Sequence, residues 1–172
     1  MLITDTEEYN LIWEKVYDRL KFKPSSEYRG HSLTSALPFS PITDFAVYTI
    51  DKMTDEQIEA MQEQIIAVFA KMSSKGRRMY ALDWNHSAFL FDPGNLDEQK
   101  SIRVEDSAFP GAGYDAYFPS FYPDGDYCFF IDEIFEFGYL GHPWRREVWV
   151  FGDEMIKSFD EIYDKLGWEK LR

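Results

Sequence analysis

Cysteine is nearly absent from this sequence. Cys128 is the single cysteine among 172 residues, so no disulfide can form within the chain. It lies in the apolar run YCFFI with no activating base beside it, which predicts a buried and unreactive thiol. No apolar run reaches the length of a membrane span, and no basic segment followed by an apolar core opens the chain. These absences predict a cytoplasmic protein without a membrane partner.

The sequence also lacks the short motifs of the common enzyme classes. It contains no G-x-S-x-G nucleophile motif, no phosphate-binding loop and no pair of histidines at the spacing of zinc ligands. The segment FPGAGYDA includes G-x-G, but the third glycine, the preceding strand and the following helix of a dinucleotide site are missing. We therefore expect no cofactor and no metal, and we favour a protein that is not an enzyme.

Basic residues are scarce relative to acidic ones. The chain has 18 Lys and Arg against 31 Asp and Glu, which gives a formal net charge of −13. A surface with this charge repels a phosphate backbone, so nucleic acid is disfavoured as a direct ligand.

Apolar and aromatic residues, in contrast, are abundant. Apolar residues make up 45% of the chain and aromatic residues 18%, and 172 residues suffice for one well-buried core but not for two. We expect a single domain over residues 1–172. Apolar residues at helical spacing predict amphipathic helices at 4–22, 54–76 and 153–168. Aromatic and β-branched runs predict strands at 45–50, 79–84, 87–93, 126–131, 135–140 and 147–152, with a shorter one near 102–104.

The order of these elements indicates the fold class. Several strands follow one helix without an intervening helix, which favours an antiparallel or mixed sheet. We predict a two-layer α+β domain with helices packed on that sheet. The helix at 54–76 is expected to contact strands around Val47, Leu82, Phe129 and Trp149 through one apolar stripe, which consists of Ile58, Met61, Ile65, Val68, Phe69 and Met72. Residues 23–43 and 109–123 are expected to be irregular, the second a long loop packed by its own side chains.

The stretch FYPDGDYCFFIDE allows three interpretations. Proline, aspartate and glycine at 123–125 are typical of a turn that leads into a buried strand, and we favour this interpretation. A calcium loop is disfavoured because YCFFI supplies none of the further oxygen ligands. Asp124 and Asp126 are also close enough in sequence to act as a paired acid and base, if a substrate cleft lies beside them.

An enzyme remains the alternative function. The segments DWNH and GHPWRR supply two histidines and a further carboxylate in addition to Asp124 and Asp126. A small hydrolase or a metal-dependent enzyme would use these residue types, provided that they converge in space. The candidate residues are Asp83, His86, Asp124, Asp126 and His142.

The favoured function is protein binding, because one long interval of the chain contains acidic residues and no basic ones. No lysine or arginine lies between Arg103 and Arg145, whereas eight acidic residues do. If folding gathers these acids beside exposed tyrosines, the resulting face would suit a basic protein partner. An immunity-type inhibitor of a basic toxin would work in this way. The candidate binding residues are Asp115, Asp124, Glu136, Tyr114, Tyr117 and Tyr122.

Three aromatic-rich sequence segments resemble those of a known family. The combination of YALDWNHSAFLFDP, FYPDGDYCFFI and FGYLGHPWRREVWVFG resembles the uncharacterised bacterial family called domain of unknown function 2716. The resemblance extends from Tyr80 to the C-terminal helix. It implies a bacterial cytoplasmic protein and carries over no catalytic residue.

Overall fold

The computed structural model describes residues 1–24, 39–73, 76–95, 101–106, 108–109 and 111–172. Over these residues the chain forms the helices α1 (Thr6–Leu20), α2 (Asp55–Met72) and α3 (Asp153–Asp160). The strands are β1 (Phe45–Thr49), β2 (Met79–Asp83), β3 (Ala88–Phe91), β4 (Ser101–Glu105), β5 (Gly113–Tyr117), β6 (Cys128–Asp132), β7 (Gly138–His142), β8 (Glu147–Phe151) and β9 (Glu169–Lys170). Most of the irregular connection expected at 23–43 lies outside the described residues.

Seven of the strands form one sheet. Their order is β3-β2-β6-β7-β8-β1-β9, and every neighbouring pair is antiparallel. The expected α+β class with an antiparallel sheet is therefore confirmed. The six longer strands predicted from the sequence correspond to β1, β2, β3, β6, β7 and β8.

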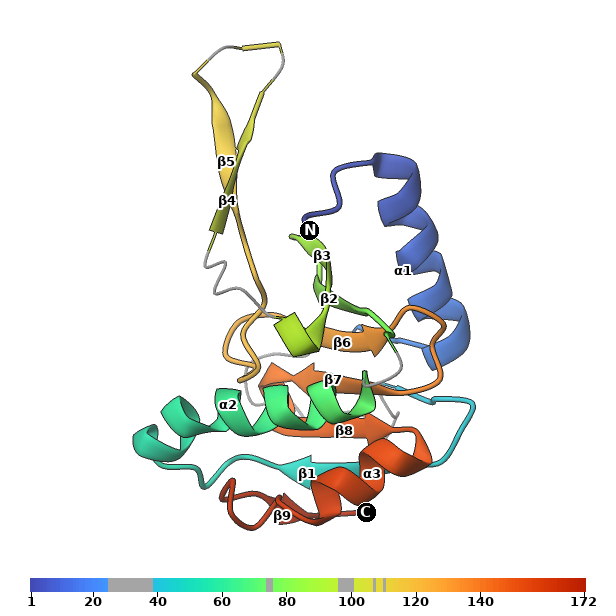
Figure 1. The fold of residues 1–172 in the computed structure, drawn as a ribbon, viewed down its shortest axis with the longest axis vertical. Helices are drawn as coiled ribbons and strands as arrows, with labels where there is room; N and C mark the ends of the chain where they lie inside the picture. Colours follow the sequence, from blue (N-terminus) through green and yellow to red (C-terminus); the bar gives the residue numbers. More distant parts are fainter. Residues whose placement is uncertain (25–38, 74–75, 96–100, 107, 110) are drawn as a thin grey trace.

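Helices cover both faces of this sheet. The Trp13 ring of α1 meets Phe129 edge-on with centroids 5.4 Å apart, whereas Phe69 of α2 lies 5.8 Å from Phe130. Phe129 and Phe130 are successive residues of β6, so their side chains point to opposite faces. Figure 1 shows α2 and α3 together across β7, β8 and β1, well apart from α1. The fold thus has three layers, one more than the sequence pattern indicated.

The apolar stripe of α2 is confirmed. Thr54 caps the helix: its hydroxyl accepts the Gln57 amide at 3.3 Å, and the Gln57 side chain accepts the Thr54 amide at 2.9 Å. Four of the six predicted stripe residues are buried and two are partly buried. Helix α2 packs on the expected strands, but it contacts the residues next to the predicted ones, which include Ala46, Ala81 and Phe130. The side chains of the predicted residues point to the other face of the sheet and belong to the core beneath α1, namely Val47, Leu82, Phe129 and Trp149.

One helix terminus differs from the sequence expectation. Helix α1 is capped by Asp5, whose carboxylate accepts the Glu8 amide at 2.8 Å, within the predicted range. Helix α3 ends at Asp160 instead of near residue 168, because the following turns fold back and stack Trp168 on Phe159 with ring centroids 5.6 Å apart. No helix in the described part of the chain is both long and apolar enough to cross a lipid bilayer.

The strands β4 and β5 form a separate hairpin that projects from the body of the molecule (Figure 1). Their register pairs Ser101 with Tyr117 and Glu105 with Gly113. The expectation of one packed loop at 109–123 is therefore wrong over β5, because GYDAY pairs with the alternating strand SIRVE. Its second half does pack, and Phe121 is buried in the α2-side core.

Candidate binding cleft

The loop before β6 carries two of the predicted acidic residues. It turns at Pro123, across which the Asp124 N–H donates to the Tyr122 carbonyl at 3.0 Å. The chain thus turns here as predicted, but the hydrogen bond closes over residues 122–124 rather than 123–125, and the strand begins at Cys128 rather than at Asp126. The aromatic side chains predicted to be buried at this point are fully buried, namely Tyr127, Phe129 and Phe130.

The tight turn between β2 and β3 brings Asp83 and His86 to the same end of the sheet. The His86 amide donates to the Asp83 carbonyl at 3.0 Å, and Asn85 takes a left-handed conformation with φ 65°, which asparagine tolerates. Asp83 pairs with Cys128, directly after the loop that carries Asp126. The His86 Nε2 consequently lies 3.4 Å from the Asp126 Oδ2.

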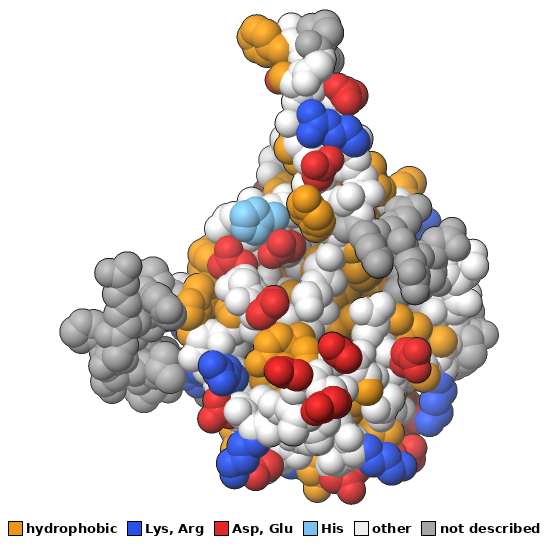
Figure 2. All heavy atoms as spheres, turned by 90° about the vertical axis from the view of Figure 1, so that its left-hand side faces the viewer, with side chains coloured by type: hydrophobic (Ala, Val, Ile, Leu, Met, Phe, Trp, Pro, Cys, Tyr) orange, Lys and Arg blue, Asp and Glu red, His pale blue; other side chains and the backbone are white. Residues whose placement is uncertain are grey.

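A cleft of about 500 Å³ lies between this turn and the hairpin. The Ser87 hydroxyl donates to the Tyr117 carbonyl at 2.6 Å and so ties the base of the hairpin to the turn. Figure 2 shows the hairpin projecting above a surface histidine and several acidic side chains. The cleft combines residues from both functional hypotheses, and its lining consists of Asp83, Asn85, His86, Ser87, Tyr114, Asp115, Ala116 and Tyr117.

The Asp83 carboxyl group is strongly perturbed by this setting. Partial burial raises its pKa from 3.8 to about 6, while His86 acts to lower the pKa and Asp126 and Asp124 act to raise it. Over the described residues, no lysine or arginine forms an ion pair with these three carboxylates, and His86 is their one ion-pair partner. A carboxyl group with this pKa, next to a histidine in a cleft, is typical of sites that bind or transfer protons or cations.

His142 does not join this group. It is buried on β7, where the Arg145 amide lies 3.4 Å from its Nδ1 and the Tyr127 hydroxyl lies 3.4 Å from its Nε2. Burial and the nearby Arg145 charge lower its pKa to about 3, so the ring is neutral. Gly141, the preceding residue, shares the face of Asp83 because both pair with the same residue of β6. The side chain of His142 therefore points to the opposite face of the sheet.

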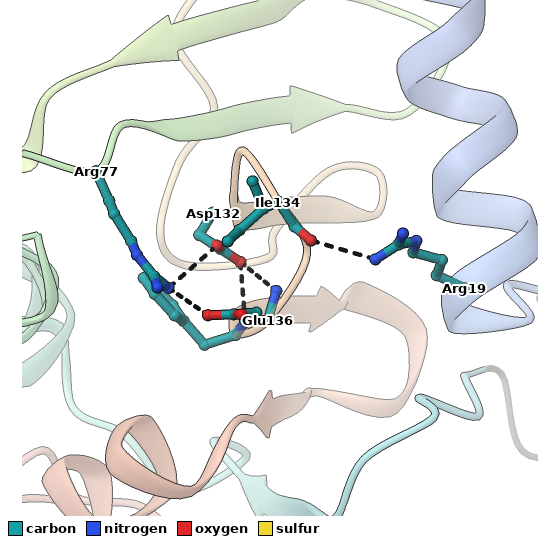
Figure 3. A network of polar contacts seen from close by, with 6 residues as sticks. Arg19, Arg77, Asp132, Ile134 and Glu136 are labelled. Atoms are coloured by element: carbon teal, nitrogen blue, oxygen red, sulfur yellow. Dashed lines mark hydrogen bonds and ion pairs between the residues drawn. The ribbon is translucent and has the colours of Figure 1, made fainter.

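Glu136 also lies apart from the cleft, at the other end of β6 (Figure 3). There, the Asp132 Oδ1 accepts the backbone N–H groups of Glu136 at 2.6 Å and of Phe137 at 2.9 Å. The Arg77 guanidinium pairs with Glu136 and lies 3.7 Å from the Asp132 Oδ2. The full length of β6 separates this network from Asp124, so the structure does not bring Glu136 into the cleft.

The acidic interval between Arg103 and Arg145 is thus divided in space. On the hairpin, Arg103 lies 3.6 Å from Glu105 and 3.7 Å from Asp115. At the far end of β6, arginines pair with Glu133 as well as Glu136. The loop that carries Asp124 and Asp126 has no arginine or lysine partner in the described part of the chain. Asp106, near the tip of the hairpin, also lacks a basic partner there and accepts the Ala108 amide at 2.7 Å instead.

Exposed aromatic side chains lie on the hairpin. Tyr114 is 60% exposed and Tyr117 is 62% exposed, whereas Tyr122 is partly buried. Phe109 lies beyond the strands and is 69% exposed, and it was not predicted as a binding residue. The available signal was a phenylalanine next to turn-forming residues, a pattern that also fits a packed loop.

The described residues do not offer a metal centre. A protein metal site needs three or more converging ligands, and no such group of His, Cys, Asp or Glu side chains occurs among them. Cys128 is buried, and burial raises the pKa of its thiol to about 12, which makes thiolate chemistry unfavourable.

Comparison with known proteins places the chain in a family. Residues 3–156 match the family described as "Protein of unknown function (DUF2716)". The chain belongs to this family. The match includes the N-terminal region and so extends beyond the aromatic-rich words that carried the resemblance. The chain is also 30% identical over 153 residues to the uncharacterized protein YxiI of Bacillus subtilis (strain 168), a match that covers 87% of this chain and 85% of that protein. No solved structure matches the chain significantly.

Proposed function

We propose that this protein is a non-enzymatic binding module that captures a basic protein with the β4–β5 hairpin and the adjacent cleft. The observation that carries the proposal is the hairpin itself. It projects from the sheet and exposes Phe109, Tyr114 and Tyr117. Aromatic rings contribute more to stability when they are buried, so a group of exposed rings indicates an interaction surface. Aromatic residues are enriched where protein interfaces form. The hairpin strands also each have one edge that pairs with no other described strand, which a partner strand can use.

The charge of the chain selects the kind of partner. The net charge of −13 favours association with a basic protein by electrostatic steering. The carboxylates of Asp83, Asp124 and Asp126 lie beside the hairpin without an arginine or lysine partner among the described residues. A toxin with a basic substrate groove is a partner of this kind, and an immunity-type inhibitor would bind it by covering that groove. We propose a bacterial cytoplasmic setting for this role.

The test is specific capture followed by matched substitutions. The purified chain is immobilised and exposed to lysate of the source bacterium at low and at high salt. We expect a basic protein to be retained at low salt, and we expect retention to fall in the double variant Tyr114→Ala, Tyr117→Ala. The control is Leu171→Ala, which removes an exposed apolar side chain far along the chain from the hairpin. Equal retention by the double variant and by the control would contradict the proposal.

A second candidate function rests on Asp83. Its pKa of about 6, next to His86 and Asp126, suits general acid–base catalysis near neutral pH. A panel of ester, phosphoester and glycoside substrates assayed between about pH 5 and pH 8 tests this candidate. Turnover that is abolished in Asp83→Asn, with the fold intact, would replace the binding proposal by an enzymatic one.

A further inference from the structure

We infer that the cleft beside β5 binds the side chain of one arginine, supplied by the basic partner. The inference rests on the proposed function, which it makes specific: the hairpin supplies the contact area and the cleft selects the residue at its centre. It does not depend on the identity of the partner, because an arginine side chain can be offered to the cleft as a small molecule.

The size of the cleft fits one long side chain. Its volume of about 500 Å³ falls within the range of roughly 300–1,000 Å³ that is typical of small-ligand sites. The β2–β3 turn forms one wall and the β5 strand forms the other, and Ser87 holds the two walls together through the Tyr117 carbonyl. An entering side chain would therefore meet a preformed site.

The charge of the cleft requires a cation. Asp83 is partly buried, and the Asp126 side chain is 30% exposed. Carboxylates removed from bulk water interact more strongly with an incoming charge than exposed ones do. His86 is the one ion-pair partner that the described residues provide for them, and it is 61% exposed and so weakly held. On the β5 wall, Arg103 lies 3.7 Å from the Asp115 carboxylate. Over the described residues, no arginine or lysine pairs with Asp83 or Asp126 in the way that Arg77 and Arg78 pair with the carboxylates at the far end of β6.

The lining favours a guanidinium group over the other cations. A metal ion is disfavoured because no three ligand side chains converge in the described part of the chain. A lysine ammonium is compact and strongly hydrated, and it offers no flat surface. A guanidinium is planar, pairs with a carboxylate through two parallel hydrogen bonds and stacks on aromatic rings. The lining offers both kinds of contact, with the Asp83 carboxylate at the end of β2 and the tyrosines of β5. Because Tyr114 and Tyr117 point to opposite faces of β5, one of the two rings stacks on the guanidinium.

The experiment is an NMR titration of the whole chain with a capped arginine, Nα-acetyl-arginine N-methylamide. Capped citrulline is the matched control, because it has nearly the same shape and no charge. We expect saturable shifts of the ring signals of Tyr114 or Tyr117 and of the His86 ring signals with arginine, and none with citrulline. Capped lysine should bind about tenfold more weakly than arginine, since it loses the bidentate and stacking contacts.

Variants then locate the binding. Asp83→Asn and Asp126→Asn should each raise the dissociation constant of capped arginine by about tenfold, as expected for the loss of one partly desolvated charge pair. Glu136→Gln, at the other end of β6, should leave the constant unchanged. Absence of saturable shifts, equal shifts with citrulline, or insensitivity to both aspartate variants would overturn the inference.

The outcomes separate this inference from the proposed function. Hairpin-dependent capture of a basic protein without arginine binding would overturn the arginine site and leave the binding module. If the chain binds capped arginine but captures the basic protein equally well with and without the hairpin substitutions, the proposed binding module would be wrong and the arginine site would stand.

Discussion

Strand β6 has acidic residues at both of its ends. At the end that follows the strand, Asp132 is fully buried and accepts two backbone N–H groups, and Arg77 lies beside it. At the end that precedes the strand, Asp124 is exposed and Asp126 contacts only the exposed His86 as an ion-pair partner among the described residues. Residues of one chemical type therefore have two different environments within one strand length.

The comparison teaches how a carboxylate used for folding differs from one left for a ligand. The backbone amides beside Asp132 lose their hydrogen bonds to water on folding. The Asp132 carboxylate accepts hydrogen bonds from them in place of water, and it thereby stabilises the turn after β6. The loop before β6 is held without its carboxylates: the Tyr139 hydroxyl donates to the Phe121 carbonyl at 2.6 Å, and Pro123 packs close to Gly141. Its carboxylates are consequently free to meet a partner.

The largest effect should come from removing the buried carboxylate. Asp132→Ala leaves the amides of Glu136 and Phe137 without their acceptor, and each unsatisfied buried group costs about 1–3 kcal/mol. We expect the free energy of unfolding to fall by about 2–4 kcal/mol in a urea titration. Asp124→Ala is the control from the other end and should change it little. Equal losses in the two variants would remove the distinction between the ends.

A smaller effect should come from the apolar contacts that hold the loop before β6. A Cβ atom at Gly141 would lie 2.8 Å from the Pro123 Cβ and closer still to the Cys128 sulfur. We expect Gly141→Ala to lower the free energy of unfolding by about 1–3 kcal/mol, as overpacking does. Gly125→Ala is the matched control, because no atom lies within 4 Å of its Cβ position. If Gly141→Ala were as stable as Gly125→Ala, packing would not hold this loop.

The pH dependence of stability should report the cleft. The folded state raises the pKa of Asp83 from 3.8 to about 6, so it binds this proton more tightly than the unfolded chain does. The contribution of Asp83 to the free energy of unfolding is fully present at pH values below the pKa of Asp83 in the unfolded chain. It is lost as the pH rises through the pKa of Asp83 in the folded chain. Asp83→Asn cannot ionise, so its stability relative to the unaltered chain should increase between about pH 4 and pH 7. Thermal unfolding across this range measures the difference, and a constant difference would contradict the perturbed carboxyl group.

The smallest expected effect is that of divalent metal ions. The cleft end lacks three converging ligands among the described residues, so calorimetric titration with calcium or zinc should show no stoichiometric binding. Tight one-to-one binding that is lost in Asp124→Asn or Asp126→Asn would instead assign the loop to a metal.

The fold was largely predictable because its signals are local. The apolar stripe at helical spacing indicated α2, and the run YCFFI indicated a strand buried on both faces. A central strand that is buried on both faces requires cover on both, so this run pointed to a third layer, although the element order indicated two. The run does not reveal which helix covers each face. Strand β5 was missed because GYDAY lies between glycine- and proline-rich segments and becomes a strand only through its pairing with β4.

The candidate site was predictable in residue types more than in grouping. Asp83, His86 and Asp126 were proposed for one hypothesis and the tyrosines of β5 for another, and the cleft contains residues of both. The separation of His142 follows from the alternation of side chains across the sheet, which requires the strand register. The register also separates Glu136 from the cleft, since it lies beyond the opposite end of β6.

The most direct test of the account compares charge reversal at the two ends of β6. Asp124→Lys and Glu136→Lys change an exposed carboxylate in the same way, one beside the cleft and one beside Arg77. The affinity of each variant for the captured basic protein is measured at low salt. The account predicts a large loss of affinity for Asp124→Lys and little change for Glu136→Lys. Equal losses, or a larger loss for Glu136→Lys, would contradict it.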